Sequence, residues 1–189
     1  MYVNQVGGQD ELVFDGHSFV MNNKGEVLDY LIGWKEQVKT YTFQRNTDSF
    51  IVKKSPQQDF SSEYNVWNAL VLGLKDYVTK NLFNNVILGL SGGIDSAVTS
   101  ALCAKTGFKT IAISMPIKQN LNQHDLSLKH LDWLKNNFDN VETRIIELDN
   151  VFESFEKTMQ DFNNSLAFAN SRSRLRMVTL YQIAQANSG

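Results

Sequence analysis

The sequence predicts an α/β fold, a doubly wound parallel sheet, that is preceded by a short β piece. Three observations lead to this prediction. From Ser61 onward, apolar runs of strand length alternate with runs of helical periodicity. The first 33 residues instead hold short apolar runs between turn residues. A hydrophobic share of 42% over 189 residues is enough to bury the core of one ordinary domain.

The N-terminal piece favours strands. Its runs "ELVFDG", "SFVMNN" and "EVLDYLI" are separated by turn signals at Gly16, Asn22 and Gly25. About 30 residues of strand do not form a core alone, because isolated hairpins are only marginally stable. We therefore expect residues 1–34 to pack against another part of a protein. Residues 35–60 are polar and predict a connector.

A helix is expected to begin at Ser61 or Ser62, where a hydroxyl can cap it, with Glu63 in its first turn. Its apolar residues fall on one face: Val66, Leu70, Leu74, Tyr77 and Val78. Strands are then predicted at 85–90, 109–114 and 142–147, and helices at 95–106, 123–137, 149–162 and 167–186. Gly107 stands where the C-terminus of a helix favours a residue with positive φ. Such alternation predicts parallel strands with helices on both faces.

Charge and composition exclude several classes of protein. The net charge is −2, so no overall basic field points to nucleic acid or a membrane surface as a partner. The start, "MYVNQVGGQDEL", lacks the features of a signal peptide, and no run of about 18 apolar residues predicts a membrane span. Cys103 is the only cysteine, so a disulfide cannot form within the chain. We expect a cytoplasmic protein that contacts neither nucleic acid nor membrane.

The stretch "LGLSGGIDSAV" places Ser91, two glycines and Ser96 where a predicted strand turns into a helix. In parallel sheets, ligands bind at the carboxyl ends of the strands, near helix N-termini. Gly92 and Gly93 have no Cβ, so backbone N–H groups can approach an anion closely. The first helical turn adds free N–H donors and the positive end of the helix dipole. The stretch therefore predicts an anion cradle, most simply for phosphate.

Asp95 has two interpretations. A carboxylate beside a phosphate repels it unless a cation lies between them, and Mg²⁺ prefers mixed carboxylate and phosphate oxygens. Alternatively, Asp95 only favours the helix N-terminus, as many acidic residues do. No lysine follows Gly93, so the loop is not a Walker A motif and is poorly equipped for γ-phosphoryl transfer. It suits holding pyrophosphate while another group attacks the α-phosphorus.

The residues "SGGIDS" resemble the pyrophosphate loop of the N-type ATP pyrophosphatases, Ser-Gly-Gly-x-Asp-Ser. Members of that family adenylate a carboxylate or carbonyl oxygen, release pyrophosphate and admit a nitrogen or sulfur nucleophile. The resemblance implies ATP and Mg²⁺ as cofactors, with Asp95 as the metal ligand. The stretch "ISMPIKQNLNQHD" resembles the family's Met-Pro segment, where backbone groups hold the adenine edge. The ATP-binding residues that the resemblance implies are Gly89, Leu90, Ser91, Gly92, Gly93, Ile94, Asp95, Ser96 and Met115.

The stretch "NSRSRLRMVTLY" resembles the NAD synthetase segment Asn-x-x-x-Arg-x-Arg-Met, which implies that Asn170 and Arg174 bind deamido-NAD. Ala169 stands where that family usually has glutamate. In a helix, Arg172 and Arg176 share a face, whereas Arg174 points roughly 160° away from either. The three arginines therefore cannot all serve one anion. A solvated basic face remains an alternative for Arg172 and Arg176.

The N-terminal stretch "VNQVGGQDELVFDGHSFV" resembles the closing strands of the nitrilase-type glutaminase domain of glutamine-dependent NAD synthetases. The resemblance implies that residues 1–34 end such a domain, that 35–60 connect, and that 61–189 begin a synthetase domain. It also implies a carbon–nitrogen ligase of NAD biosynthesis. Deamido-NAD would be amidated to NAD through an adenylated intermediate, with ammonia from glutamine, in a homo-oligomer.

Two alternatives remain beside this function. One is a non-catalytic remnant that binds nucleotide weakly, and the other is a different adenylating amidotransferase with the same loop, such as a GMP synthetase. We also expect the chain to be a fragment that is inactive alone. The resemblance implies glutaminase residues ahead of Met1, and metal and ATP residues beyond Gly189. No residue of the chain itself is assigned a catalytic role.

Overall fold

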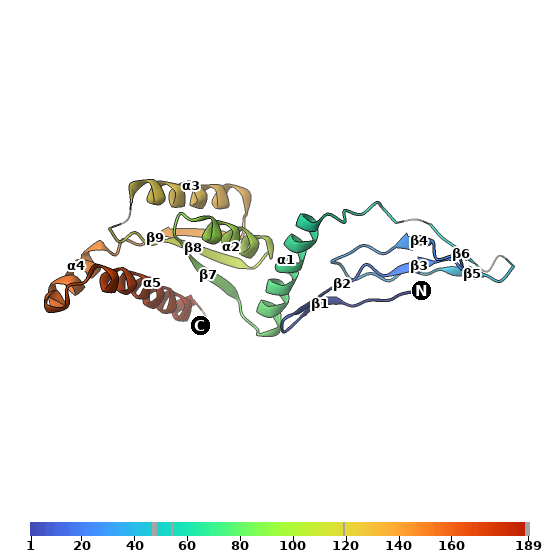
Figure 1. Ribbon diagram of the computed structural model, residues 1–189, viewed down its shortest axis with the longest axis horizontal. Helices are drawn as coiled ribbons and strands as arrows, with labels where there is room; N and C mark the ends of the chain where they lie inside the picture. The colour runs from blue at the N-terminus through green and yellow to red at the C-terminus, as the bar shows by residue number, and fades with distance from the viewer. Residues whose placement is uncertain (47–48, 54, 119, 188–189) are drawn as a thin grey trace. The chain divides into compact units, whose positions relative to one another are not determined.

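The computed structural model describes four stretches of the chain, residues 1–46, 49–53, 55–118 and 120–187 (Figure 1). Three of the residues outside these stretches belong to the predicted connector. The chain divides into two compact units, Met1–Asn81 and Leu82–Gly189. Within the four stretches, no helix is both long and apolar enough to cross a membrane.

The first unit contains three antiparallel hairpins and one long helix. Its elements are β1 (Val6–Gln9), β2 (Leu12–Asp15), β3 (Phe19–Met21), β4 (Val27–Tyr30), β5 (Thr42–Gln44), β6 (Ser49–Ile51) and α1 (Ser62–Lys80). β1 pairs with β2, β3 with β4, and β5 with β6. The first two hairpins lie in the predicted β piece, whereas the third lies in the predicted connector. There Phe43 and Phe50 pack with ring centroids 5.1 Å apart.

Helix α1 is fixed to β1 through the backbone of Gly8. The Gly8 N–H donates to the Asp76 carboxylate at 2.7 Å, and the Lys80 ammonium donates to the Gly8 carbonyl. An added Cβ on Gly8 would lie 3.2 Å from the Cα of Gly73, so two glycines allow the close approach of strand and helix. The β1–β2 hairpin thus gains from α1 a packing partner that it lacks by itself.

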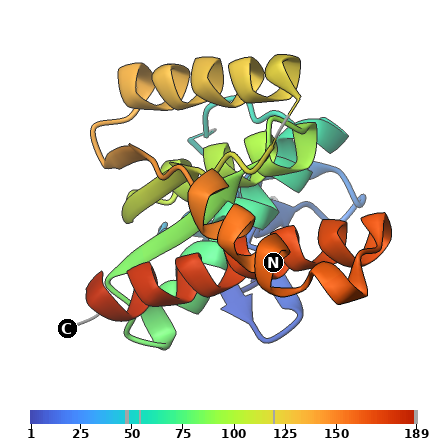
Figure 2. The same ribbon diagram turned by 90° about the vertical axis from the view of Figure 1, so that its left-hand side faces the viewer.

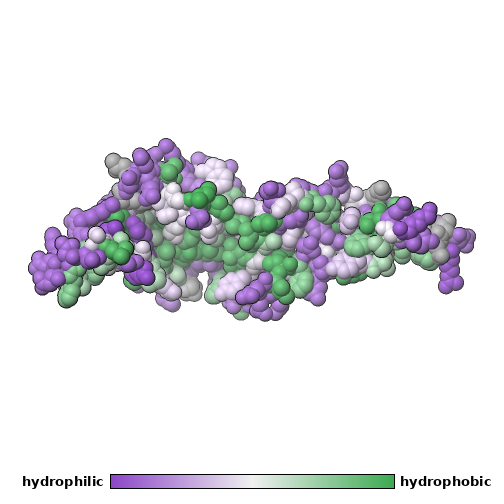
Figure 3. All heavy atoms as spheres, viewed as in Figure 1, coloured by the Kyte–Doolittle hydropathy of each residue, from purple (hydrophilic) through white to green (hydrophobic). Residues whose placement is uncertain are grey.

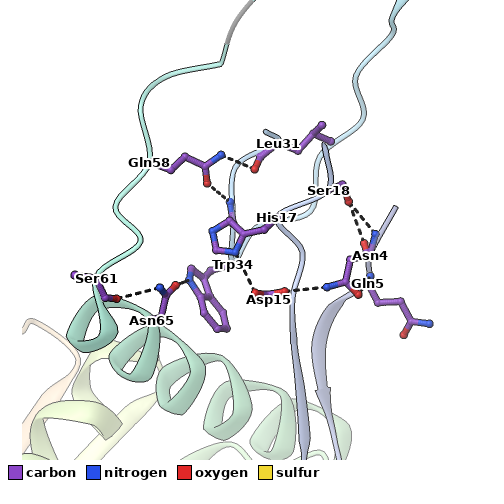
Figure 4. A network of polar contacts seen from close by, with 11 residues as sticks. Asn4, Gln5, Asp15, His17, Ser18, Leu31, Trp34, Gln58, Ser61 and Asn65 are labelled. Atoms are coloured by element: carbon purple, nitrogen blue, oxygen red, sulfur yellow. Dashed lines mark hydrogen bonds and ion pairs between the residues drawn. The ribbon is translucent and has the colours of Figure 1, made fainter. Parts of the chain in front are cut away.

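A polar network leads from β2 to the start of α1 (Figure 4). The His17 Nδ1 lies 3.1 Å from the Asp15 carboxylate, and the Asp15 carbonyl accepts from the Trp34 N–H at 2.8 Å. The Trp34 indole donates to Asn65 at 3.1 Å, and the Asn65 amide donates to the Ser61 carbonyl at 3.0 Å. Ser61 stands at the predicted cap position, but its hydroxyl does not cap the helix. The Trp34 side chain from the β piece contacts the first turn of α1 instead.

The predicted apolar face of α1 is only partly buried. Val78 is 3% exposed, whereas Val66, Leu70 and Tyr77 are 56%, 50% and 61% exposed. Figure 3 shows hydrophobic side chains at the surface where Figure 1 draws α1. The hairpins therefore do not cover the whole apolar stripe that the sequence pattern predicts.

The carboxylate of Asp29 on β4 ties the connector to the strands. Its side chain is 2% exposed and accepts hydrogen bonds from the Lys39 ammonium at 2.5 Å, the Tyr41 hydroxyl at 2.7 Å and the Ser55 N–H at 2.7 Å. Burial by itself would raise the pKa of Asp29, but these hydrogen bonds outweigh it and lower the pKa to about 2. The connector is held by a charged network.

The second unit is an α/β layer structure. Its elements are β7 (Asn85–Leu90), α2 (Ile94–Lys105), β8 (Lys109–Ser114), α3 (Leu121–Asn137), β9 (Val141–Ile145), α4 (Asp149–Thr158), the 3₁₀ turn η1 (Gln160–Phe162) and α5 (Ser165–Asn187). The three strands are parallel in the order β7-β8-β9. Leu90 pairs with Ser114, and Ser114 pairs with Ile145, so the carboxyl ends of the strands lie level.

Two apolar cores cover the two faces of this sheet. Ile111 and Ile113 of β8 pack with Phe152 of α4 and with α5 residues, whereas Ala112 packs with Leu134 of α3 and with α2 residues. Successive residues of a strand point to opposite faces, which explains the division. Figure 2 shows α3 and α5 on opposite sides of the strands. The predicted sheet with helices on both faces is confirmed.

Most predicted boundaries hold within two residues. The largest difference is at the predicted helix 149–162, which ends at Thr158 and continues as a 3₁₀ turn. The backbone leaves the helical conformation at Met159, with φ −100° and ψ 21°. Gly107 has φ +84° just beyond α2, as its predicted position requires.

We expect the first unit to lose stability as the pH falls from about 4 to about 2. The pKa of Asp29 is about 2 in the fold, below its ordinary value of 3.8, so its ionised form stabilises the fold above the ordinary pKa. This contribution, about 2 kcal/mol, is lost as the pH falls through the folded pKa. Urea unfolding followed by circular dichroism measures it. Asp29→Asn should remove this part of the pH dependence, and an unchanged profile in the variant would contradict the assignment.

Candidate functional site

The stretch from Ser91 to Ser96 forms the turn between the carboxyl end of β7 and the start of α2. Its two serines hold the turn together. The Ser91 Oγ lies 3.1 Å from the Ser96 Oγ, and the Ser96 Oγ donates to the Gly93 carbonyl at 2.9 Å. The Gly93 N–H donates to the Ser91 Oγ at 3.2 Å. Ser91 and Gly93 are exposed, so an approaching anion can take over these local hydrogen bonds.

Gly92 is the one position of the turn that requires glycine on two counts. Its φ is +82°, in the left-handed region where a Cβ is unfavourable. An added Cβ would also lie 2.1 Å from the carbonyl oxygen of Gln123, at the start of α3. The turn and α3 therefore touch backbone to backbone at this point.

Asp95 lies in the first turn of α2 and is exposed. Its carboxylate forms no hydrogen bond or ion pair with any other described residue, whereas its carbonyl accepts from the Thr99 hydroxyl at 2.8 Å. Among the residues that the structure describes, no group of three His, Cys, Asp or Glu side chains is arranged to hold a metal. Mg²⁺ often uses one carboxylate together with phosphate oxygens and water, so the single unpaired carboxylate fits such an ion. Both interpretations of Asp95 remain compatible with this geometry.

A cavity of about 510 Å³ lies beside the turn, at the carboxyl edge of the sheet. Of the residues expected to bind ATP, those that line it are Gly89, Leu90, Ser91 and Met115. A neighbouring cavity of about 410 Å³ between α2 and α3 is lined by Gly92, Gly93, Ile94 and Ser96. Leu90 borders both cavities, and Asp95 lines neither of them. The residues expected to bind ATP, apart from Asp95, are therefore divided between two neighbouring cavities that border the turn.

Met115 is held in place from two directions. Its side chain is 3% exposed and packs in the core with Ile113 and Ile117. Its carbonyl accepts a hydrogen bond from the Nε of Arg176 on α5 at 2.8 Å. Burial lowers the pKa of Arg176, and the nearby Arg172 lowers it further. The two residues of this contact are 61 positions apart, and no local pattern in the sequence signals it.

Asn170 and Arg174 lie together, but not at the cavity beside the turn. Both are exposed and line a separate cavity of about 450 Å³ between α4 and α5. Its other walls are mostly apolar and include Val151, Phe152 and Phe155. Arg172 and Arg176 instead line the cavity of Ser91 and Met115. The three arginines divide between two cavities, as the helical geometry predicts.

Comparison with known proteins gives one consistent family. The family model described as NAD synthase matches residues 66–189. A glutamine-dependent NAD(+) synthetase from a Synechocystis species is 32% identical, over 97% of this chain and 33% of its own length. The chain spans a third or less of the length of the first curated relatives that it matches.

Solved structures agree with this match. The glutamine-dependent NAD+ synthetase from Acinetobacter baumannii, in complex with adenosine diphosphate, has a TM-score of 0.86 and 31% identity, covering 98% of this chain and 35% of that one. The NMN synthetase from Francisella tularensis has a TM-score of 0.61 and 34% identity, covering 69% of this chain and 52% of that one. Their similarity confirms the predicted fold class.

We expect Gly92→Ala to destabilise the second unit more than Gly107→Ala does. Both glycines have φ above +80°, but only at Gly92 would the added Cβ meet another backbone atom. The left-handed conformation alone costs roughly 1–2 kcal/mol for a residue with a Cβ, and the collision adds to this at Gly92. Chemical unfolding of the two variants measures the difference. Equal losses of unfolding free energy in the two variants would mean that α3 can move away from the added Cβ without further destabilisation.

Proposed function

This chain belongs to the NAD synthase family, and from that premise we propose that it is part of a glutamine-dependent NAD synthetase. ATP adenylates the nicotinate carboxylate of deamido-NAD. A carboxylate oxygen bonds to the α-phosphorus while the bond to pyrophosphate breaks, and ammonia then displaces AMP to leave the amide of NAD. The observation that carries the proposal is the Ser91–Ser96 turn, which joins a parallel strand to a helix beside a cavity that Met115 also lines.

The turn would hold the pyrophosphate part of ATP. Its exposed Ser91 hydroxyl and Gly93 N–H, together with the start of α2, supply donors without a fixed positive charge. The base would lie toward Met115, whose backbone is fixed by the core and by Arg176. Backbone groups near Met115 would recognise the edge of adenine by hydrogen bonds, and a fixed backbone favours one base over the others.

Mg²⁺ would lie between the Asp95 carboxylate and the phosphates. An exposed carboxylate without a partner in the described chain supports this role, because it is available for an incoming ion. When bound, the ion would neutralise phosphate charge and favour departure of pyrophosphate. Asp95 itself would orient the ion and thereby the phosphates.

Deamido-NAD would use the cavity of Asn170 and Arg174. Apolar walls suit an aromatic ring, and a guanidinium with an amide beside it suits a phosphate or carboxylate. The identity with an NMN synthetase suggests a second candidate, in which the smaller nicotinate mononucleotide takes this place. The NAD synthase match favours either substrate over the GMP synthetase alternative.

The remaining parts of the proposal concern the whole protein. Residues 1–34 would end a glutaminase domain that supplies ammonia, 35–60 would connect, and 61–189 would begin the synthetase domain. The names of the relatives support the use of glutamine. A homo-oligomer and a cytoplasmic location complete the proposal.

Asp95→Asn should lower turnover by orders of magnitude without unfolding the protein, because the amide binds Mg²⁺ poorly. The assay follows AMP and NAD formation by the full-length protein with ATP, Mg²⁺, deamido-NAD and ammonium. Asp132→Asn, at an exposed position of α3, is the matched control and should leave turnover unchanged. Normal activity of Asp95→Asn would mean that Asp95 does not hold Mg²⁺ and only favours the N-terminus of α2.

Replacing Asn170 or Arg174 with alanine should weaken deamido-NAD more than ATP. A charge-assisted hydrogen bond contributes about 1.5–3 kcal/mol, so we expect a roughly ten- to hundredfold rise in the KM for deamido-NAD. Nicotinate mononucleotide assayed in parallel decides between the two substrates. An equal rise in both KM values would instead indicate damage to α5.

A further inference from the structure

Two arginines on α5 face the cavity beside the Ser91–Ser96 turn. Arg172 and Arg176 are four residues apart, and both line this cavity together with Ser91 and Met115. Both side chains are partly buried, unlike the exposed Arg174 between them. The sequence pattern left a solvated basic face as an alternative for this pair, and their position at a cavity wall argues against it.

Neither guanidinium has a carboxylate partner in the described parts of the chain. The third cation of the cavity, Lys118, differs, because its ammonium lies 2.6 Å from the Glu156 carboxylate. Arg176 uses its Nε for the Met115 carbonyl, and its two terminal nitrogens bond to no other described residue. Arg172 lies over the Phe152 ring, 5.7 Å from the centroid, a contact that leaves its N–H groups available.

Such an arrangement is unfavourable without a ligand. Like charges four residues apart on a helix repel each other, and partial burial reduces the solvation of both. An anion between the two groups would reverse both effects, and guanidinium groups match phosphate oxygens in geometry. The turn itself contains no lysine, so this pair supplies positive charge that the turn lacks.

We propose that Arg172 and Arg176 form a subsite for the phosphate group next to the ribose of the nucleotide. The assignment rests on the proposed function, in which the base lies toward Met115 and the pyrophosphate lies on the turn at Ser91. The ribose-linked phosphate then falls between these two points, where the arginine pair borders the same cavity. The subsite neutralises the phosphate that a carboxylate anion has to approach.

The test is nucleotide binding by the full-length protein, measured by calorimetry with AMP, ATP, adenosine and pyrophosphate as separate probes. Arg172→Gln should weaken AMP and ATP about ten- to hundredfold and leave adenosine and pyrophosphate nearly unchanged. Arg176→Lys, which retains the charge, should weaken AMP less than Arg176→Gln. Arg144→Gln, which removes a guanidinium paired with Glu142, is the matched control and should bind like the unaltered chain.

Three outcomes would overturn the subsite. Weakening of pyrophosphate with AMP unaffected would assign the arginines to the turn instead. Unchanged binding of AMP and ATP in both glutamine variants would show that the arginines do not contact the nucleotide. Failure of the unaltered full-length protein to bind AMP would also contradict the proposal. Because the measurement involves no turnover, its result is independent of whether the full-length protein makes NAD.

Discussion

Burial of strand β8 on both faces is the constraint on which the second unit depends. Every residue from Thr110 to Ser114 is 0% exposed. A strand with no solvated face needs helices on each side, and these come from right-handed crossovers between parallel strands. Parallel strands in turn end at one edge of the sheet. The turn after β7 and Met115 after β8 therefore lie beside each other, although Gly93 and Met115 are 22 positions apart in the sequence.

The sequence predicts the features that arise from local periodicity or from a short motif. Strands 85–90 and 109–114 are found at their predicted bounds, and the alternation with helices predicts the layers correctly. Contacts between distant residues leave no such trace. Gly8 meets Asp76 across 68 positions, and Arg176 meets Met115 across 61. The turn could be predicted from its composition, whereas the position of α5 at the cavity beside it could not.

The two units differ in how their buried charged side chains are compensated by hydrogen-bond partners. Asp29 is surrounded by three donors, and its pKa is lowered despite its burial. Arg176 has one carbonyl partner and a neighbouring like charge, and its pKa is lowered because its charged form is disfavoured. The first arrangement stabilises the fold by itself. Under the proposed subsite, an anion between Arg172 and Arg176 would make the second arrangement favourable, which is how a binding site differs from a structural ion pair.

Helix α5 contributes to both the cavity beside the Ser91–Ser96 turn and the cavity of Asn170 and Arg174. It is held to the sheet by the Arg176–Met115 bond and by the Asn85 side chain, which donates to the Asn187 carbonyl at 3.0 Å. A helix with side chains is about 10–12 Å wide, so a carboxylate on one side cannot reach phosphorus on the other through it. Arg172 borders the cavity beside the turn, and its guanidinium lies over Phe152, which borders the cavity of Asn170 and Arg174. Under the proposed function, the carboxylate and the phosphate therefore have to meet around the Arg172–Phe152 contact, at the N-terminal half of α5.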